Sequence, residues 1–239
     1  MIIFDGVSID SVAPVAIEDI KVSPIRLSPI VRPRAINWGS EFVRMRGGER
    51  TISVTFSLLQ QNMIERQESI INIAKWAKSD AEHNLELPID QMRYLTCVCT
   101  ERPEPSTRVW WENKLRLVFT CFSNPYWSSK AVKTFYLSDA NPLTVFIQGD
   151  APPRMRITRA NTSGGTMVRA FTVDGETISF NSSLPTGTLR IDVNNQIATV
   201  GNNSAMQYYE PTSTFFIPHT GSQTIQAANT YFYYRERWQ

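Results

Sequence analysis

The sequence predicts a mainly β protein: an N-terminal β-sandwich or barrel-like domain that carries one packed α-helix, followed by an antiparallel β-sandwich. Along most of the 239 residues, polar and apolar side chains alternate in short runs, as they do in half-buried strands. A single stretch, residues 62–79, repeats its apolar residues at helical spacing instead. Beyond Trp127 the composition changes, because Lys133 is the last lysine and threonine, asparagine and glycine become frequent. We therefore divide the chain into domains at residues 1–130 and 131–239.

The segment that follows the first strand is rich in proline. Ile2–Phe4 is predicted as a strand and Asp5-Gly6 as a turn, before Pro14, Pro24, Pro29 and Pro33. Proline donates no backbone hydrogen bond, so this density excludes a helix and disfavours a central strand. We expect extended segments or edge strands joined by loops, or an arm that packs on a neighbouring molecule.

A hairpin is predicted between residues 42 and 58. Phe42–Arg46 has the pattern of a strand, and Gly47-Gly48 permits the positive φ of a tight turn. Arg50–Leu58 then alternates polar and apolar side chains over nine positions. The pattern indicates two paired strands with one buried face.

The predicted helix runs from Asn62 to Ser79. Asn62 is a good N-cap, and Glu65 stands three residues later, in capping-box spacing. The last turn carries Lys75 and Lys78, whose charges complement the helix dipole. We expect one apolar face to pack on a sheet, formed by Ile64, Gln67, Ile70, Ile71, Ala74 and Ala77.

Further strands are predicted at residues 85–88, 93–99 and 109–122, and the last of them stops abruptly. Ser123-Asn124-Pro125 ends the apolar run, and two aromatic residues follow at once. An active-site loop or a sugar-binding aromatic pair would also fit these residues. The simplest interpretation is a seam between the two domains, formed by Phe122, Asn124, Pro125, Tyr126 and Trp127.

The second half shows no helical period. Tight turns are indicated by Asp174-Gly175 and Asn194-Asn195 between short alternating runs. Closely spaced strands with such turns predict an antiparallel sandwich. The predicted strands are residues 154–158, 168–173, 177–180, 189–193, 196–200, 213–217, 223–225 and 231–235.

Composition excludes several classes of protein. The net charge of +2 is too small to indicate nucleic-acid binding through bulk charge. No apolar run approaches the roughly 20 residues that span a bilayer, and MIIFDGVSID lacks the features of a signal peptide, so we expect a cytosolic chain without membrane insertion. Cys97, Cys99 and Cys121 are odd in number and lack zinc-site spacing, which favours buried free thiols in a reducing compartment.

The sequence offers no reactive constellation. The two histidines, His83 and His219, lie in polar or turn segments, and neither belongs to a nucleophile or metal motif. We therefore predict no catalytic residues, no cofactor and no metal. A glycosidase pair would leave no local signature, because its carboxylates can lie far apart in the chain. A sandwich-fold glycosidase or esterase thus stays as a third alternative.

Clusters of aromatic residues could stack on sugars. The candidates are Tyr208-Tyr209, Phe215-Phe216 and Tyr231–Tyr234. In strands, however, aromatic side chains more often form the core or cross-strand pairs. This pattern leaves a carbohydrate-binding host-recognition module as the second hypothesis for function.

Several motifs, in this order and spacing, resemble a known family. A strand, Arg50–Phe56, runs into a helix that ends Ile73–Ala77, and Phe122–Trp127 marks the midpoint. The second half adds Gly187–Asp192, then Phe215–Pro218 before Gly221, and the chain ends Tyr234–Trp238. Over nearly its whole length the chain resembles the distal tail proteins of long-tailed bacteriophages, the Dit family.

The resemblance implies a structural, non-enzymatic protein of the virion tail tip, assembled in the host cytoplasm. In this family N-terminal domains form a hexameric ring with a central channel, and DNA passes through the channel only as cargo. The expected partners are other copies of the chain in a homohexamer, the tail tube protein, the tail-associated protein, and receptor-binding or side-fibre proteins. The resemblance also suggests that the ring interface involves Phe42, Arg44, Arg46, Glu49 and Arg50.

The second domain of such proteins is a galectin-like β-sandwich. Galectin sugar sites combine a polar His/Asn/Arg cluster with a stacking tryptophan. Here the second domain has only His219 and Trp238 of these two aromatic types. The resemblance therefore concerns the sandwich and does not extend to the galectin sugar site.

Overall fold

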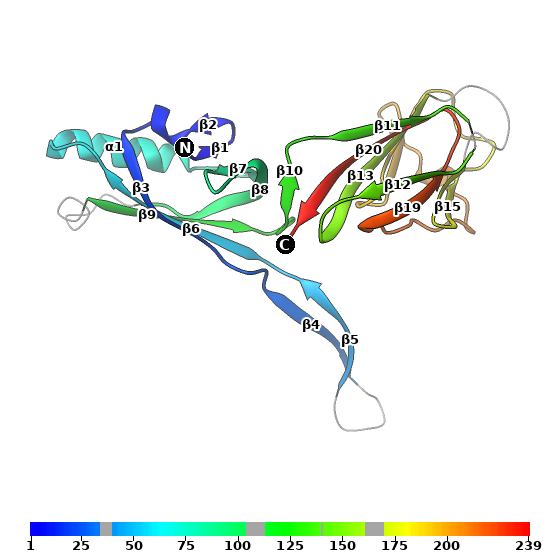
Figure 1. Cartoon of the computed structure of the whole chain (residues 1–239), viewed down its shortest axis with the longest axis horizontal. Coiled ribbons are helices and arrows are strands. Elements are labelled where there is room, and N and C mark those ends of the chain that lie inside the picture. The colour runs from blue at the N-terminus through cyan, green and yellow to red at the C-terminus, as the bar shows by residue number, and fades with distance from the viewer. Residues whose placement is uncertain (34–39, 104–112, 140, 161–169) are drawn as a thin grey trace. The chain divides into compact units, whose positions relative to one another are not determined.

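The computed structural model describes residues 1–33, 40–103, 113–139, 141–160 and 170–239 (Figure 1). Its described part is mainly β, with antiparallel sheets and one α-helix, as the sequence predicts. The chain forms two compact units, Met1–Trp127 with Gln239, and Ser128–Trp238. No helix in the described ranges is long and apolar enough to cross a membrane.

The first unit is an open antiparallel sheet with a helix packed on it. Its strands follow in the order β2-β1-β7-β8-β9-β6-β3, and no pairing among the described residues closes this sheet into a barrel. The elements are β1 (Ile3–Phe4), β2 (Val7–Ser8), η1 (Ile9–Ser11), β3 (Val15–Val22), β4 (Leu27–Pro33), β5 (Ser40–Gly47), β6 (Arg50–Leu58), α1 (Met63–Trp76), β7 (His83–Leu87), β8 (Asp90–Glu101) and β9 (Lys114–Cys121).

The predicted alternation of β6 is confirmed. Every second residue of this strand is buried, and Ile52, Val54 and Phe56 have no exposed surface. Burial of large aliphatic and aromatic side chains stabilises the unit by roughly 1.5–3 kcal/mol each, before the entropy of folding is counted.

The helix begins where the sequence predicts. The side chain of Asn62 accepts a hydrogen bond of 3.0 Å from the Ile64 amide. The helix ends at Trp76, three residues before the predicted end. At this end an aromatic cluster joins α1 to the sheet, because the ring of Phe4 lies 5.9 Å from Trp76 and 5.2 Å from Phe119.

The predicted apolar face of α1 is only partly correct. Ile70 and Ala77 are buried, together with Ile73, which the pattern left out. Ile64 and Ile71 are 67% and 37% exposed. The helix therefore buries a narrower stripe than its apolar pattern predicts, at Ser69, Ile70 and Ile73.

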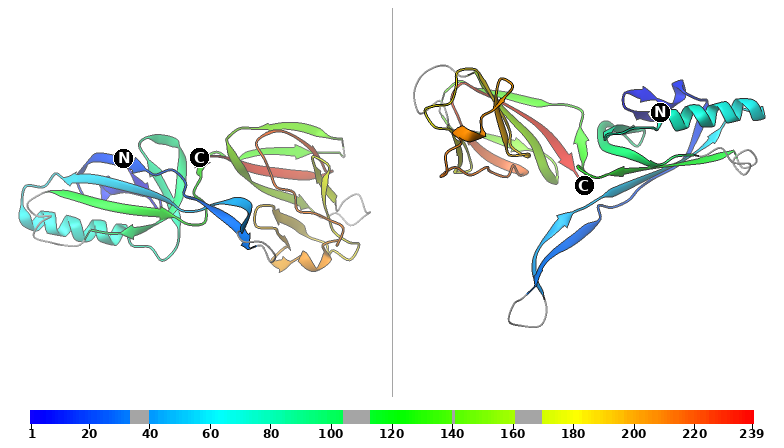
Figure 2. Two further views of the ribbon diagram at one scale, coloured as in Figure 1. Left: turned by 90° about the horizontal axis from the view of Figure 1, so that it is seen from below. Right: turned by 180° about the vertical axis from the view of Figure 1, so that it is seen from behind.

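The predicted hairpin of residues 42–58 is wrong. β5 pairs with β4, whereas β6 pairs with β3 and β9, so β5 and β6 follow one another along the same side of one long hairpin. Gly47-Gly48 is therefore no turn. The hairpin runs out along β3 and β4 and returns along β5 and β6, and both views of Figure 2 show β4 and β5 side by side.

The second unit is a sandwich of two antiparallel sheets, as predicted. One sheet has the order β18-β17-β16-β13-β20-β11, and the other has the order β12-β19-β14-β15. The strands are β11 (Lys133–Leu137), β12 (Leu143–Ile147), β13 (Ala151–Ala160), β14 (Ala170–Val173), β15 (Glu176–Ser179), β16 (Thr188–Asp192), β17 (Ile197–Val200), β18 (Asn203–Ser204), β19 (Gly221–Gln226) and β20 (Thr230–Trp238), with η3 at Met206–Tyr208 and the short β10 at Trp127–Ser129. Ile157, Phe171, Ile191, Ile225 and Phe232 lie in the core between the sheets.

In this half one predicted strand is absent and two observed strands had no counterpart in the prediction. Residues 213–217 form no strand, because this segment makes only isolated backbone bonds beside β15, such as Thr214 N to Thr177 O at 3.1 Å. β11 and β12 are not among the predicted strands. Parts of the predicted strands 109–122 and 168–173 lie outside the described residues, at 104–112 and 161–169.

Candidate functional site

The two-stranded ribbon β4–β5 carries three of the predicted ring-interface residues. In its register Arg46 lies opposite Ser28, Arg44 opposite Ile30 and, past a bulge, Phe42 opposite Val31. Glu49 is exposed just before β6, and Arg50, the first residue of β6, is only 4% exposed in the single chain. The interface itself stays a prediction.

Within the described part of the chain, β4 and β5 pair only with each other. Each strand therefore has an outer edge whose backbone N–H and C=O groups can accept a further strand. Pro29 and Pro33 lie on β4, which agrees with the edge strand predicted from the prolines.

A close backbone contact joins the ribbon to the sheet. The Gly48 amide donates to Arg26 O at 2.8 Å, and the Arg26 amide donates to Glu49 O at 3.0 Å. A Cβ atom at Gly48 would lie 2.6 Å from Arg26 O, so no side chain fits there without a shift of the backbone. Gly48 therefore serves a close approach rather than the positive-φ turn that the sequence predicts.

The predicted seam follows the end of β9. Trp127 and Pro125 are buried, Asn124 and Tyr126 are partly buried, and Phe122 is 51% exposed. This segment is organised by a carboxylate, Glu82, that no sequence pattern singled out. Glu82 Oε1 accepts from the amides of Phe122 at 2.8 Å and Ser123 at 3.0 Å, and Oε2 accepts from the Ser123 hydroxyl.

These contacts shift the ionisation of Glu82. Partial burial alone raises the pKa of its carboxyl, but the hydrogen bonds from Ser123 and Phe122 outweigh it, and the net pKa is lowered. Glu82 is thus held as a carboxylate that fixes the turn after β9. The assignment of this segment as a seam between domains stays a prediction.

Both histidines pair with a carboxylate distant in sequence. His83 Nδ1 lies 2.7 Å from Asp5 Oδ1, and His219 Nε2 lies 2.8 Å from Asp174 Oδ2. The Thr220 carbonyl at 2.9 Å from Nδ1 contributes most to raising the pKa of His219; burial lowers this pKa, Asp174 raises it, and the net pKa is raised. Thr224 N also donates to Asp174 Oδ1 at 2.7 Å, and this bond ties the β14–β15 turn to β19.

That turn borders a cavity of about 340 Å³ lined by Asp174, Glu176, Phe215, Phe216, Ile217 and His219. The lining holds two acids, an imidazole and the hydroxyl of Thr214, but in the described contacts the His219 ring bonds to Asp174 and the Thr220 carbonyl and not to a nucleophile. Over the described ranges, no three His, Cys, Asp or Glu side chains are grouped so as to hold a metal ion.

The aromatic candidates separate into two groups. Phe216, Phe232 and Tyr234 are buried in the sandwich, and Tyr209 stacks on Phe215 at 5.1 Å beside the core. Tyr231 and Tyr233 lie on the opposite side of β20, where Tyr231 is 45% exposed. The outward pair is joined by Tyr136 of β11, whose ring lies 4.6 Å from that of Tyr231.

The comparison with solved structures decides the fold. Over 100% of this chain and 98% of the other, the structure superposes on the Dit protein of phage SPP1 with a TM-score of 0.75 and 13% sequence identity. The chain has the Dit fold. The resemblance found in the sequence is thereby confirmed for the fold, and it covers both units.

The SPP1 Dit protein is described as a paradigm of the hub adsorption apparatus in phages that infect Gram-positive bacteria. Two baseplate structures of phage P2, with Ca and with Sr, also match at 12% and 11% identity, with TM-scores of 0.45 and 0.44. They cover 95% and 94% of this chain and 91% of each of those chains, and the fold assignment does not depend on them. No family model and no curated protein matches the sequence.

Proposed function

We propose that the chain is a structural, non-enzymatic hub of a phage tail tip, in which six copies form a ring around a channel for DNA. The observation that carries the proposal is the Dit fold over the whole of both units. A fold shared at 13% identity is compatible with different partners, so the partners follow from the proposal and not from the superposition.

The β4–β5 ribbon supplies the element from which such a ring can be built. Its two strands have open edges, and its connection to the sheet is fixed at Gly48 and Arg26. Strand addition between neighbouring copies would satisfy these backbone groups and would bring Arg44 and Arg46 of one copy near carboxylates such as Glu49 of the next. Unit 1, together with its ribbon, is accordingly the ring-forming domain of the proposal.

The remaining assignments follow from the same proposal. The ring joins the tail tube protein on one side to the tail-associated protein on the other, and DNA crosses it only as cargo. The galectin-like sandwich of unit 2 points outward and holds receptor-binding or side-fibre proteins. The site of action is the virion tail tip, after assembly in the host cytoplasm.

The test is the mass of the purified chain across a concentration series, followed by negative-stain microscopy. We expect a species of six chains with an open centre. In a variant, a two-glycine link replaces Leu27–Gly47 and so removes the ribbon. The link can join Arg26 to Gly48 because Gly48 N already lies 2.8 Å from Arg26 O. This variant should stay folded and monomeric.

The matched control is Phe146→Ala, which changes an exposed side chain on β12 in the other unit and should assemble as the wild type does. Rings formed by the ribbonless variant would contradict the assignment of the interface. A wild-type chain that stays monomeric at all concentrations, alone and with tail tube protein, would contradict the hub.

A further inference from the structure

The outer face of the larger sheet in unit 2 concentrates tyrosine and arginine. Side chains of alternate residues point away from the core, and the register places them in two rows across the strands. One row runs through Thr134, Tyr233, Arg156, Asp192 and Ile197, and the next runs through Tyr136, Tyr231, Thr158, Arg190 and Thr199.

The tyrosines form a preorganised platform. The Tyr231 ring lies 4.6 Å from Tyr136 and 6.3 Å from Tyr233, and the Tyr136 hydroxyl donates to Asn229 Oδ1 at 3.1 Å. Tyr136 and Tyr231 are 48% and 45% exposed. Rings that are held against one another lose little conformational entropy when a ligand stacks on them.

The charge on this face is positive. Arg154, Arg156 and Arg190 are exposed there, and Asp192 is the one carboxylate among the described residues of these two rows and their neighbour Arg154. The guanidinium of Arg156 lies 4.9 Å from the centre of the Tyr233 ring. Arg190 is exposed on the same face, opposite Thr158 and Thr199 in the register.

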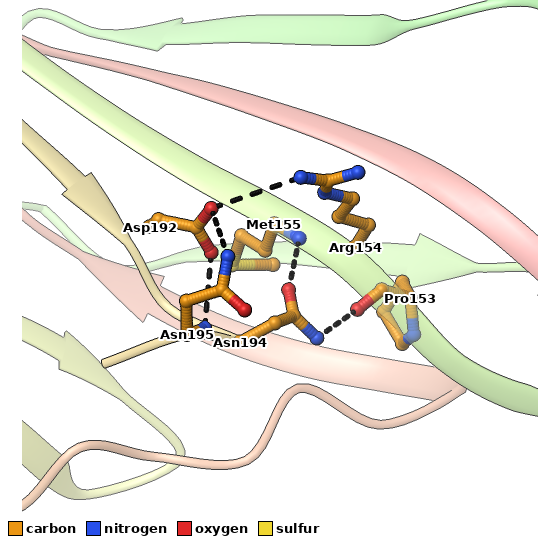
Figure 3. Close-up of polar contacts among 6 residues, drawn as sticks. All are labelled: Pro153, Arg154, Met155, Asp192, Asn194 and Asn195. Carbon is orange, nitrogen blue, oxygen red and sulfur yellow. Dashed lines mark hydrogen bonds and ion pairs between the residues drawn. The ribbon is translucent and has the colours of Figure 1, made fainter. Parts of the chain in front are cut away.

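The one carboxylate, Asp192, already has partners within this face and its adjoining loop. Asp192 accepts from the amide of Asn195 at 3.1 Å and from its side chain at 2.9 Å, and it lies 3.9 Å from Arg154 (Figure 3). Asn194 fixes the same loop to β13, through the Met155 amide at 2.7 Å and the Pro153 carbonyl at 3.0 Å. The acid therefore also shapes the loop, and three arginines against this one carboxylate leave the face with a net positive charge.

A polar hollow continues the face at the edge of the sheet. It has a volume of about 650 Å³ and shares Thr188 and Arg190 with β16. The other lining groups include Asn203, Ser204 and Gln207, whose hydroxyl and amide groups suit a ligand rich in hydroxyls. On the two rows themselves the one aliphatic side chain is Ile197, at the edge on β17.

We propose that this outer face of the β17-β16-β13-β20-β11 sheet binds an anionic, hydroxyl-rich polymer. Guanidinium groups pair with carboxylate or phosphate in the same forked geometry, so the shared chemistry covers a uronic-acid polysaccharide and a phosphodiester-linked polyol. The tyrosine platform stacks on the backbone of the polymer, Arg156 and Arg190 hold its acidic groups, and the hollow accepts its hydroxyls. Binding requires one chain only, and a ring of copies would add avidity.

The test measures binding of the full chain by calorimetry to four polymers of similar length. These are polygalacturonate, a poly(glycerol phosphate), neutral dextran and polyglutamate. We expect binding to the first two that weakens as salt rises, and the stronger of the two identifies the source of the charge. Arg190→Gln and Tyr231→Ala should each weaken it about tenfold, the loss of one charge-assisted contact or one stacking ring.

Lys78→Gln and Phe146→Ala are the matched controls, since both change exposed side chains elsewhere, and neither should alter binding. Binding to neither polyanion, or an equal loss in the controls, would overturn the proposal. Polyglutamate that binds as tightly as the hydroxylated polymers would identify a site for acidic protein segments instead. Ring mass is measured on the same samples, so a failure of the hub is distinguished from a failure of this site.

Discussion

At the scale of single residues, the contacts that fix loops join positions far apart in the chain. Glu82 holds the turn after β9, and Asp174 pairs with His219 across 45 residues. A sequence shows each of these acids as one polar residue in a loop. Turn chemistry within a few residues was predictable, as at Asp174 and Gly175, whose positive φ of 49° and 88° suit a tight hairpin. The partner of each acid could not be predicted, because the choice of partner depends on how separate elements pack.

Glu82→Gln tests the carboxylate at the seam. Its folded pKa is lowered from an ordinary value of 4.5, so its stabilisation is present above that value and is lost as the pH falls through the folded pKa. We expect the variant to lose roughly 1 kcal/mol at pH 7, a modest figure because the site is partly exposed to water. Its stability should also fall less than that of the wild type between about pH 5 and pH 3.

The measurement is urea unfolding at each pH, and the control is Glu68→Gln, an exposed glutamate on α1. If the stability of Glu82→Gln and that of the wild type fell equally steeply between about pH 5 and pH 3, the three hydrogen bonds to this carboxylate would not stabilise the fold.

At the scale of elements, the features that depend on residues within one helix or strand were predicted well. The N-cap of α1 and the alternation of β6 follow from local chemistry, and both are confirmed. The pairing of β5 with β4 was missed, because Gly47-Gly48 has the composition of a turn and the long hairpin turns elsewhere. The outward placement of Arg154 and Arg156 follows the period of β13, which also directs Arg159 into the core, where it is 1% exposed.

Gly48→Ala tests the joint between ribbon and sheet. Its methyl group would lie 2.6 Å from Arg26 O, a backbone atom that cannot rotate away as a side chain would. We expect a loss of about 1–3 kcal/mol, the usual cost of forcing an extra carbon into a tight site. Amide exchange at Arg26 and Gly48 should rise more than exchange in β8 and β9.

The control for this variant is Glu49→Ala at the next, exposed position, measured at concentrations low enough to avoid assembly. Unchanged exchange at both amides in Gly48→Ala would show that the ribbon tolerates a wider joint, and the close approach would then not explain the glycine.

At the scale of the whole molecule, the domain boundary after residue 130 stays a prediction, and the chain forms two units that divide at Trp127 and Ser128. The reason is physical: each unit has a core of its own, which needs its own set of alternating strands. Ring formation and the partners of the ring depend on surfaces that complement other molecules, and one sequence carries no record of those molecules. The fold could therefore be predicted from the sequence, whereas the interfaces stay proposals.

The three cysteines make it possible to follow one unit alone. Cys97, Cys99 and Cys121 all lie in unit 1, on β8 and β9, and are 0%, 6% and 0% exposed. Burial raises the pKa of the Cys97 thiol far above its ordinary value and that of Cys99 to about 11, so the reactive thiolate is scarce in the folded chain. A thiol reagent should leave the native protein unlabelled and should modify all three cysteines when unit 1 opens.

We expect labelling in a urea series to coincide with one of two transitions in far-ultraviolet circular dichroism, because separate cores unfold as separate cooperative units. Cys99→Ala, which removes the most exposed thiol, should reduce the label from three to two, and labelling should still coincide with the same transition. A single transition shared by both probes would show that the units fold as one. In that case the stability of unit 2 would contribute to the stability of unit 1. A destabilising substitution on the outer face of the sandwich would then also weaken the assembly of the ring.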